Sequence, residues 1–441
     1  MSDTADRDAS GRRKTGPVLP ALLVCSPLAT SAAPRLTWLF LLLIAGALIV
    51  NALLSGRDWR QLIDRNTAFI AVLLVAFYAL LSASWAGDRG AAFGKAALLL
   101  GIVSMTFAAS RALAGLDRPQ LRRAALAFAI GAFLGALFVL FELLTEGALT
   151  RMALNAGALL RGSEKNLASP HGDGEIKHEE FRRSVAVLVL HLWPALLVLS
   201  TIVSRTRRAA LVGLFVLAVA APIIISERES SQVALAGSLL VFLLARFWRR
   251  GIARALAVFW CLAFVLVLPV TFAAYQSELH MAEGLPKSAR HRIILWEYTA
   301  ERVLESPWLG IGTDSTATLS KRMVAEQPKD FVAPRTTGPH AHNLFLQVWY
   351  ELGLVGVVLA ALAGAAIALR IPLLPPEAQP FAAATFAAFG ATVAFAWGIW
   401  QTWLMCGVGL ALLYLLMAVR AGPGDSANAS GVVTNGKNPS G

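Results

Sequence analysis

The sequence predicts an all-α polytopic membrane protein with about twelve transmembrane helices. Of its 441 residues, 57% are hydrophobic and only 15% are charged, and the mean hydropathy is +0.62. Several apolar runs reach the roughly 18–20 residues that a helix needs to cross a bilayer. The chain is therefore too apolar for an ordinary soluble protein.

The expected spans follow the apolar runs in chain order. The first is the weakest, because Pro20 and Pro27 interrupt it. Residues 17–421 are predicted to form one transmembrane domain, and the polar segments 1–16 and 422–441 to be disordered cytoplasmic tails. The spans lie near residues 18–33, 36–54, 67–86, 90–109, 122–144, 183–203, 209–225, 230–246, 252–274, 343–369, 380–398 and 401–420.

Arginines in the short loops predict the orientation of these spans. They alternate onto one side together with Arg12, Arg13 and Lys14, and this side is expected to be the cytoplasm. Two long segments, 145–182 and 275–342, are then left outside. The net charge of +12 fits topology and contact with anionic lipids, and no basic segment resembles a nucleic-acid-binding module. The loop arginines are Arg57, Arg60, Arg65, Arg111, Arg118, Arg122, Arg123, Arg205, Arg207, Arg208, Arg246, Arg249, Arg250 and Arg254.

Some common kinds of chemistry find no support in the sequence. The three cysteines, Cys25, Cys261 and Cys406, lie in apolar runs without CxxC spacing, so neither a disulfide framework nor a zinc site is expected. The chain has no GxxxxGK[ST] loop, which argues against nucleotide hydrolysis as the energy source. We expect no metal site and no cofactor.

Four ionisable residues fall inside the predicted spans. Lys95, Glu142, His191 and Glu351 all lie in the outer halves of their helices. Charges within a bilayer are costly and often mark function, although side chains near a helix end can also reach the interface or pair with one another. Together these residues point to a working site on the outer side.

The outer segment 275–342 begins with a basic helix. Arg292 and Trp296 are four residues apart and share one face, and Pro307 comes after the helix. An interfacial helix whose arginines bind lipid phosphates would show the same pattern. Arg290 and Arg292 are candidates for binding a phosphate group of a substrate.

Two histidines close the same segment. His340 and His342 are two residues apart, which puts both on one side of an extended chain, and Asn343 is a natural N-cap for the next helix. A metal pair lacks further ligands nearby. A proton-accepting histidine suits an unperturbed pKa of roughly 6.5. His342 is the candidate general base, and His340 is expected to shape the site.

A third candidate is the outer turn Ser226–Ser231, which contains Arg228. The planar guanidinium group can bind two phosphate oxygens at once. An internal salt bridge to Glu227 or Glu229 is an equally good interpretation. In the first outer segment, Arg161 and the adjoining Arg183 are expected to help bind substrate, in roles that the sequence does not assign.

These features together resemble the bacterial O-antigen ligase family, part of a larger group with O-antigen polymerases and some protein oligosaccharyltransferases. The strongest match runs from His342-Asn343-x-x-Leu346 through Glu351-x-Gly353-x-x-Gly356. Arg292 before Trp296, followed by Pro307-x-x-Gly310-x-Gly312, is similar to a second family pattern. The third is Arg228, where the family usually has a preceding serine and this chain has Glu227.

The resemblance implies a lipid-carrier glycosyltransferase of GT-C-like architecture in the bacterial inner membrane. Its donor would be O-antigen polysaccharide on undecaprenyl pyrophosphate, and its acceptor a sugar hydroxyl of lipid A–core oligosaccharide at the periplasmic face. Arg228, Arg292 and Arg290 would then bind the pyrophosphate, without nucleotide or metal.

Three alternatives remain open. A polymerase would use the same donor to extend another lipid-linked repeat, and a protein oligosaccharyltransferase would use a protein acceptor. A transporter or flippase would carry the lipid-linked sugar across the membrane, and it predicts ionisable residues spread through the membrane depth. Here such residues cluster outside, which favours an enzyme.

Overall fold

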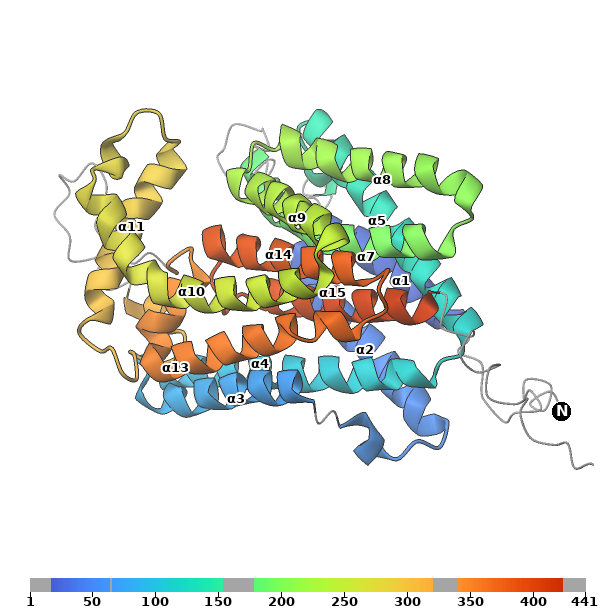
Figure 1. Cartoon of the computed structure of the whole chain (residues 1–441), viewed down its shortest axis with the longest axis horizontal. Coiled ribbons are helices and arrows are strands. Elements are labelled where there is room, and N and C mark those ends of the chain that lie inside the picture. Colours follow the sequence, from blue (N-terminus) through green and yellow to red (C-terminus); the bar gives the residue numbers. More distant parts are fainter. Residues whose placement is uncertain (1–16, 64–65, 154–177, 320–339, 423–441) are drawn as a thin grey trace, which may run out of the picture.

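The computed structural model describes residues 17–63, 66–153, 178–319 and 340–422, and within these ranges all regular structure is helical (Figure 1). The expected tails 1–16 and 423–441 lie outside the described residues. Parts of the two long outer segments, 154–177 and 320–339, lie outside them as well, together with Arg161. The all-α fold class is confirmed.

Thirteen α-helices and seven short 3-10 helices are described from end to end. The α-helices are α1 (Val18–Ala32), α2 (Thr37–Leu54), α3 (Thr67–Ser82), α4 (Arg89–Ala112), α5 (Arg118–Leu144), α7 (Arg182–Ile202), α8 (Arg205–Ile225), α9 (Glu229–Phe247), α10 (Arg249–Gln276), α11 (Lys287–Val303), α13 (Leu344–Ala368), α14 (Gln379–Phe395) and α15 (Thr402–Ala421). The 3-10 helices are η1 (Pro34–Leu36), η2 (Trp59–Leu62), η3 (Ala83–Trp85), η4 (Leu113–Gly115), η5 (His178–Phe181), η6 (Leu279–Met281) and η7 (Ile371–Leu373).

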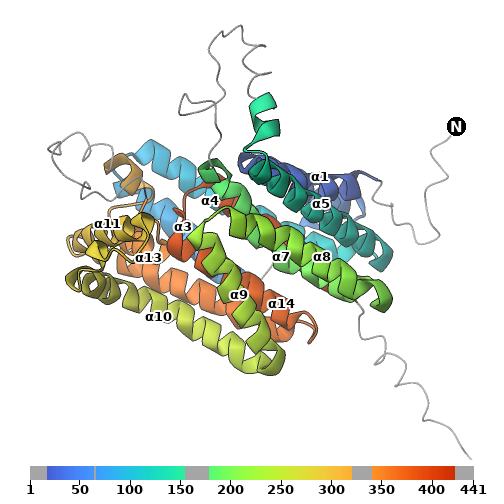
Figure 2. The same ribbon diagram turned by 90° about the horizontal axis from the view of Figure 1, so that it is seen from above.

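Each of the twelve expected spans corresponds to one helix. In the described ranges, ten of these helices are long and apolar enough to cross a membrane. The other two, α1 with 15 residues and α14 with 17, are apolar but shorter. Helix α1 continues past Pro27 and packs along α5 (Figure 2).

Helix α7 runs through the middle of the bundle. Every residue from Ser184 to Val198 is buried against its neighbours, which include α5, α14 and α15. His191 lies in this run, with its ring edge-on to Phe128 and Tyr414 at centroid distances of 6.0 and 5.5 Å. Its surroundings are aromatic and apolar, so His191 contributes packing to the core.

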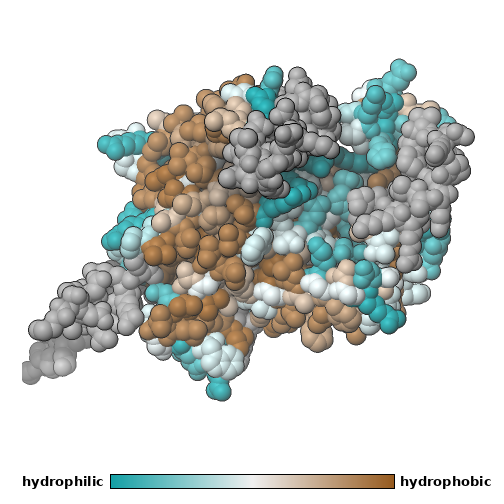
Figure 3. Space-filling model, turned by 180° about the vertical axis from the view of Figure 1, so that it is seen from behind, coloured by the Kyte–Doolittle hydropathy of each residue, from teal (hydrophilic) through white to brown (hydrophobic). Residues whose placement is uncertain are grey.

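Helix α11 stands at one end of the bundle, which we call the α11 end (Figures 1 and 2). Its apolar side packs on α10 and α13. Hydrophobic side chains cover much of the surface in Figure 3, and hydrophilic side chains gather toward the right, where the α11 end lies in that view. Helix α11 is thus placed beyond the apolar body of the bundle.

Candidate active site

Helix α11 is tied to the segment that carries the two histidines. The indole Nε1 of Trp296 donates a 2.8 Å hydrogen bond to the carbonyl oxygen of Ala341. Arg292 lies one helical turn earlier, half-buried, and close enough to His342 for an electrostatic interaction. The shared face of Arg292 and Trp296 thus positions the arginine beside the histidine.

The turn before α9 approaches α11 from the other side. The Ser288 hydroxyl donates to both carboxylate oxygens of Glu229 at 3.3 Å, and Glu229 and Arg228 both act electrostatically on Arg292. The Nε of Arg228 donates to the carbonyl oxygen of Ser226 at 3.3 Å. The structure therefore brings Arg228 and Arg292 together. Arg290 is on α11 but two residues away from Arg292, hence on a different face.

His342 is held in one orientation by the backbone. Its φ of +51° is in the left-handed region that side chains with a Cβ rarely adopt, and such strain concentrates at functional sites. Its Nδ1 is 2.8 Å from the carbonyl oxygen of Ala396, which can only accept. Nδ1 must therefore carry the proton in the neutral ring, which leaves Nε2 as the proton acceptor.

Both histidines are kept neutral by their surroundings. The rings of His340 and His342 meet edge to face at 4.0 Å. The pKa of His342 is lowered to about 4, chiefly because burial disfavours the imidazolium, and the charges of His340, Arg292 and Arg182 add to this effect. The hydrogen bond to Ala396 acts in the opposite direction. Burial likewise lowers the pKa of His340, with Arg182 and Arg183 contributing.

The first turn of α7 supplies two more arginines. The guanidinium groups of Arg182 and Arg183 both lie 5.7 Å from the centre of the Trp397 ring. Arg183 thus belongs to the same end of the bundle as the histidines. Asn343 caps α13 as expected, because its side chain accepts a 3.1 Å hydrogen bond from the backbone N–H of Leu346.

The two glycine patterns singled out in the sequence meet at a break in α13. Gly353 has φ +62° and interrupts the helix, and Gly310 has φ +68°. A Cβ at Gly310 would lie 2.4 Å from the carbonyl of Glu351, and one at Gly353 would lie 2.5 Å from that of Trp308. Only glycine fits this contact.

Backbone hydrogen bonds close the break. Ile311 and Gly312 donate to the carbonyls of Tyr350 and Glu351 at 3.1 and 2.8 Å, and Leu354 donates to that of Pro307 at 2.8 Å. The groups freed by the break in α13 are thus satisfied by the loop after α11.

Glu351 and Gln347 hold the loop 396–401, which carries the Ala396 carbonyl that orients His342. Glu351 is fully buried and accepts hydrogen bonds from Trp400 Nε1, from Gln347 Nε2 at 3.1 Å and from the backbone N–H of Asp314 at 3.0 Å. Gln347 Oε1 in turn accepts from the N–H of Ile399 at 3.2 Å.

The loop 396–401 is also held from α4 and against His340. Lys95 Nζ donates to the carbonyl of Trp400 at 3.2 Å. A Cβ at Gly398 would lie 2.6 Å from the His340 ring, so glycine lets the loop approach it. The same loop carries the Ala396 carbonyl that holds His342. Two of the ionisable residues predicted within spans, Lys95 and Glu351, therefore support the histidines.

Replacing Gln347 by methionine tests this support. Gln347→Met keeps the volume but leaves the Ile399 N–H without its acceptor and removes one of the hydrogen bonds to Glu351, so we expect a loss of about 1–3 kcal/mol of stability. The unfolding temperature of the purified variant, compared with that of the wild type, measures this loss of stability. The exposed Gln276 at the end of α10 gives the matched control, Gln276→Met. Equal unfolding temperatures for both variants would contradict the network.

In the described ranges, no group of three or more histidine, cysteine, aspartate or glutamate side chains could hold a metal ion. What the α11 end offers a ligand is a neutral imidazole nitrogen and several guanidinium groups. Arg292 makes no hydrogen bond to another described residue. This combination suits removal of a proton beside a phosphate group.

Residues 213–361 match the family model described as O-Antigen ligase. That segment contains Arg228, Arg290, Arg292, His340, His342 and the α13 break. This segment is therefore similar to the O-antigen ligase family. The resemblance inferred from the sequence is thereby confirmed.

A protein from Rickettsia conorii is similar to part of this chain. It is named "Putative polysaccharide ligase" and is 26% identical over 249 residues, which cover 53% of this chain. The match spans 57% of the relative's own length.

Parts of the site had no signal in the sequence. The Ala396 carbonyl is a backbone group, which any residue would supply, and Trp397 lies in an apolar run where it is one aromatic among many. Both lie outside the O-antigen ligase segment in sequence. The clustered arginines at 182–183 were the only hint that α7 reaches the histidines.

Proposed function

We propose that this protein is an O-antigen ligase of the bacterial inner membrane. It transfers polysaccharide from undecaprenyl pyrophosphate to a sugar hydroxyl of lipid A–core oligosaccharide. The observation that carries this proposal is the pairing of a neutral His342, with Nε2 free to accept a proton, and Arg292 beside it. A base next to a fixed cation serves a reaction in which a hydroxyl loses a proton while a phosphate leaving group gains charge.

The reaction follows from this arrangement. His342 Nε2 takes the proton of the acceptor hydroxyl as its oxygen attacks the sugar carbon that bears the pyrophosphate. The bond from that carbon to the pyrophosphate oxygen breaks, and lipid pyrophosphate leaves. Arg292 and Arg228 stabilise the added negative charge, each charge-assisted hydrogen bond contributing about 1.5–3 kcal/mol. Arg290, which lies on another face of α11, is not needed for this step and stays a prediction. No step calls for a metal ion or nucleotide.

The proposed orientation places the α11 end in the periplasm and both termini in the cytoplasm. The loop arginines support it, since they lie at the opposite ends of the helices; Arg57, for example, donates to the Arg111 carbonyl at 3.2 Å. Residues 17–421 would act as a single catalytic domain. An accessible cysteine placed at Arg89, at the start of α4, should react with a membrane-impermeant reagent from outside.

Deletion of the gene in its own cells distinguishes the candidate functions. Loss of a ligase leaves lipopolysaccharide without polysaccharide, while full-length glycan accumulates on the lipid carrier. Loss of a polymerase leaves lipopolysaccharide with a single repeat. Loss of a flippase leaves the lipid-linked repeat inside the cell. Only the first outcome agrees with the proposed function.

The pH dependence of the reaction tests the state of His342. Because the neutral ring is the active form and its pKa is lowered to about 4, kcat/KM should stay level as pH falls from 8 to about 5 and decline on approaching 4. An ordinary exposed histidine would lose activity near its unperturbed pKa of about 6.5. Initial rates with subsaturating donor measure the profile, and a midpoint near 6.5 would contradict burial of the base.

A further inference from the structure

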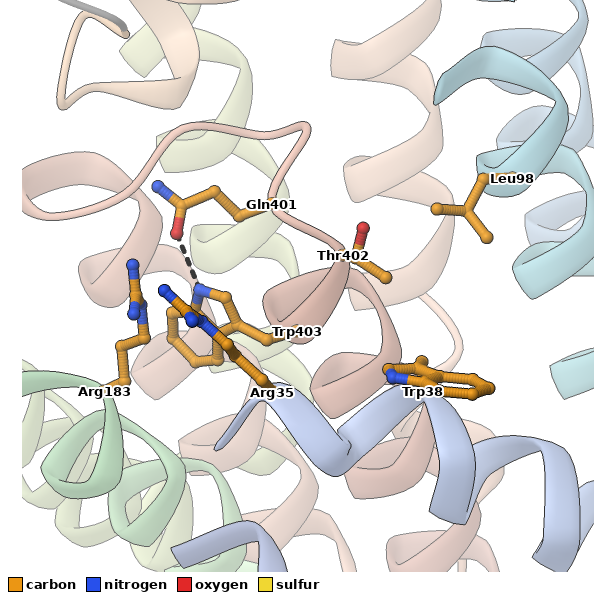
Figure 4. A pocket seen from close by; sticks show the side chains of 7 residues that line it. All are labelled: Arg35, Trp38, Leu98, Arg183, Gln401, Thr402 and Trp403. Atoms are coloured by element: carbon orange, nitrogen blue, oxygen red, sulfur yellow. Dashed lines mark hydrogen bonds between the residues drawn. The ribbon is translucent and has the colours of Figure 1, made fainter. Parts of the chain in front are cut away.

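A cavity opens at the α11 end, outside the segment that matches the ligase family. It has a volume of about 550 Å³. Its walls come from η1, α2, α7 and the start of α15, with Leu98 of α4 as an apolar side (Figure 4). The polar and aromatic residues that line it are Arg35, Trp38, Arg183, Gln401, Thr402 and Trp403. Nothing in the proposed transfer step uses this cavity.

The positive charge of the residues that line this cavity favours an anionic ligand. Arg35 and Arg183 line the same cavity and repel each other, and Arg182 adds to the repulsion on Arg183. Glu180 opposes it in part. The Arg183 Nε is buried without a hydrogen-bond partner. Within the described ranges neither Arg35 nor Arg183 forms an ion pair, so a bound anion would relieve the repulsion and satisfy the unused donors.

The remaining lining suits a sugar. Gln401 Oε1 accepts a 2.6 Å hydrogen bond from Trp403 Nε1, which leaves the Gln401 amide N–H groups to donate (Figure 4). Trp38 is 49% exposed, so an aromatic surface faces the opening. An aromatic wall with a few fixed polar groups orients a ligand that has both apolar and polar faces.

The cavity also reaches toward lipid. Leu98 lies nine residues past the start of α4, which places it about 14 Å along that helix at 1.5 Å per residue. Helices α2 and α4 both belong to the set long and apolar enough to span a membrane. A ligand here can keep its acyl chains in the bilayer while its headgroup meets the arginines.

The cavity is linked to the base by aromatic contacts. Trp403 lies edge-on to Trp397 at 4.9 Å, and Arg183 both stacks on Trp397 and acts electrostatically on His340. Arg228 and Arg292 lie on the α9 and α11 side of the histidines and are assigned to the donor. The side formed by α2, α7 and α15 is therefore left for the acceptor.

We propose that the cavity lined by Arg35, Arg183, Trp38 and Gln401 binds the phosphorylated sugar headgroup of the acceptor glycolipid. This inference rests on the proposed ligase function. It assigns Arg183, whose substrate-binding role the sequence left open, to the acceptor, whose free hydroxyl then points to His342.

Binding without donor tests the proposal separately from catalysis. The protein is placed in phosphatidylcholine nanodiscs, and binding of fluorescent rough lipopolysaccharide is measured before and after enzymatic removal of its phosphates. Arg35→Gln and Arg183→Gln should each weaken binding of the phosphorylated form about 10-fold, and Arg35→Lys should weaken it less. Arg89→Gln, an exposed arginine at the start of α4, is the matched control and should bind like the wild type.

The dephosphorylated acceptor completes the comparison. It should bind the wild type about 10-fold more weakly, and the Arg35→Gln variant should show no further loss. Trp38→Ala, at the rim of the cavity, should weaken binding of the phosphorylated and the dephosphorylated acceptor equally. This variant tests the cavity if a variant of a more buried residue fails to fold.

Three results would overturn the assignment. One is unchanged acceptor binding in Arg35→Gln and Arg183→Gln, and another is competition by phosphatidylglycerol as strong as that by the glycolipid. The third is displacement by millimolar inorganic phosphate alone, which would indicate a simple anion site. Acceptor binding that follows the predicted pattern in a protein without transfer activity would instead refute the ligase function and leave the cavity assignment standing.

Discussion

His342→Ala is expected to abolish polysaccharide transfer, with kcat lowered by about 10²–10⁴-fold, the usual contribution of a positioned general base. The variant removes Nε2, the only acceptor that the Ala396 hydrogen bond leaves on this ring. Binding of the lipid-linked donor should change little, because the guanidinium groups that we propose for the pyrophosphate remain. Single-turnover transfer with saturating donor measures the effect.

Two controls accompany this variant. His291→Ala removes an exposed histidine from α11 and should retain wild-type transfer. Thermal unfolding of His342→Ala should begin slightly below the wild-type temperature, because alanine keeps the strained φ of +51° and loses the half-buried ring with its hydrogen bond to Ala396. Wild-type turnover in His342→Ala would remove the histidine from the chemistry.

Arg292→Lys is expected to lower kcat about 10²-fold although the formal charge is kept. A lysine offers a single ammonium in place of the two-pronged guanidinium group that matches phosphate oxygens. Burial lowers the pKa of Arg292, while Glu229 raises it. A lysine in the same place starts from a lower intrinsic pKa of about 10.4 and is more easily neutralised there.

The effect of Arg292→Lys should appear in donor turnover rather than in protein level. Arg302→Lys, at the far end of the same helix, is the matched control, because Arg302 forms an ion pair with Glu305 away from the histidines. Transfer by Arg292→Lys at the wild-type rate would make Arg292 a surface arginine that only binds lipid phosphate.

The sequence was sufficient to predict the membrane-spanning helices, because apolar runs of span length depend on composition alone. It also predicted that Asn343 caps α13 and that Arg292 shares a face with Trp296, since both depend on residues close in the chain. Long-range contacts could not be predicted in this way. The fit of Gly310 against the α13 break joins residues about forty positions apart, and only the folded backbone shows why both patterns need glycine.

The cavity lined by Arg35 and Arg183 could not be predicted from the sequence for a similar reason. Arg35, Arg183 and Gln401 come from three widely separated parts of the chain, and each alone is an ordinary residue at the end of a span. The arginine pair becomes informative only when the helices place the two guanidinium groups in one cavity. Lys95 and Glu351 were recognised as unusual within spans, but their partners Trp400 and Gln347 could not be identified from spacing.

The most direct test of the ligase mechanism is transfer by the purified protein. The reaction contains glycan on undecaprenyl pyrophosphate, rough lipopolysaccharide and EDTA, without nucleotide, and its products are separated by gel electrophoresis. We predict that glycan moves to lipid A–core and that free undecaprenyl pyrophosphate is released in equal amount. Growth of glycan on its carrier without transfer to lipopolysaccharide, or no reaction until a divalent metal is restored, would contradict it.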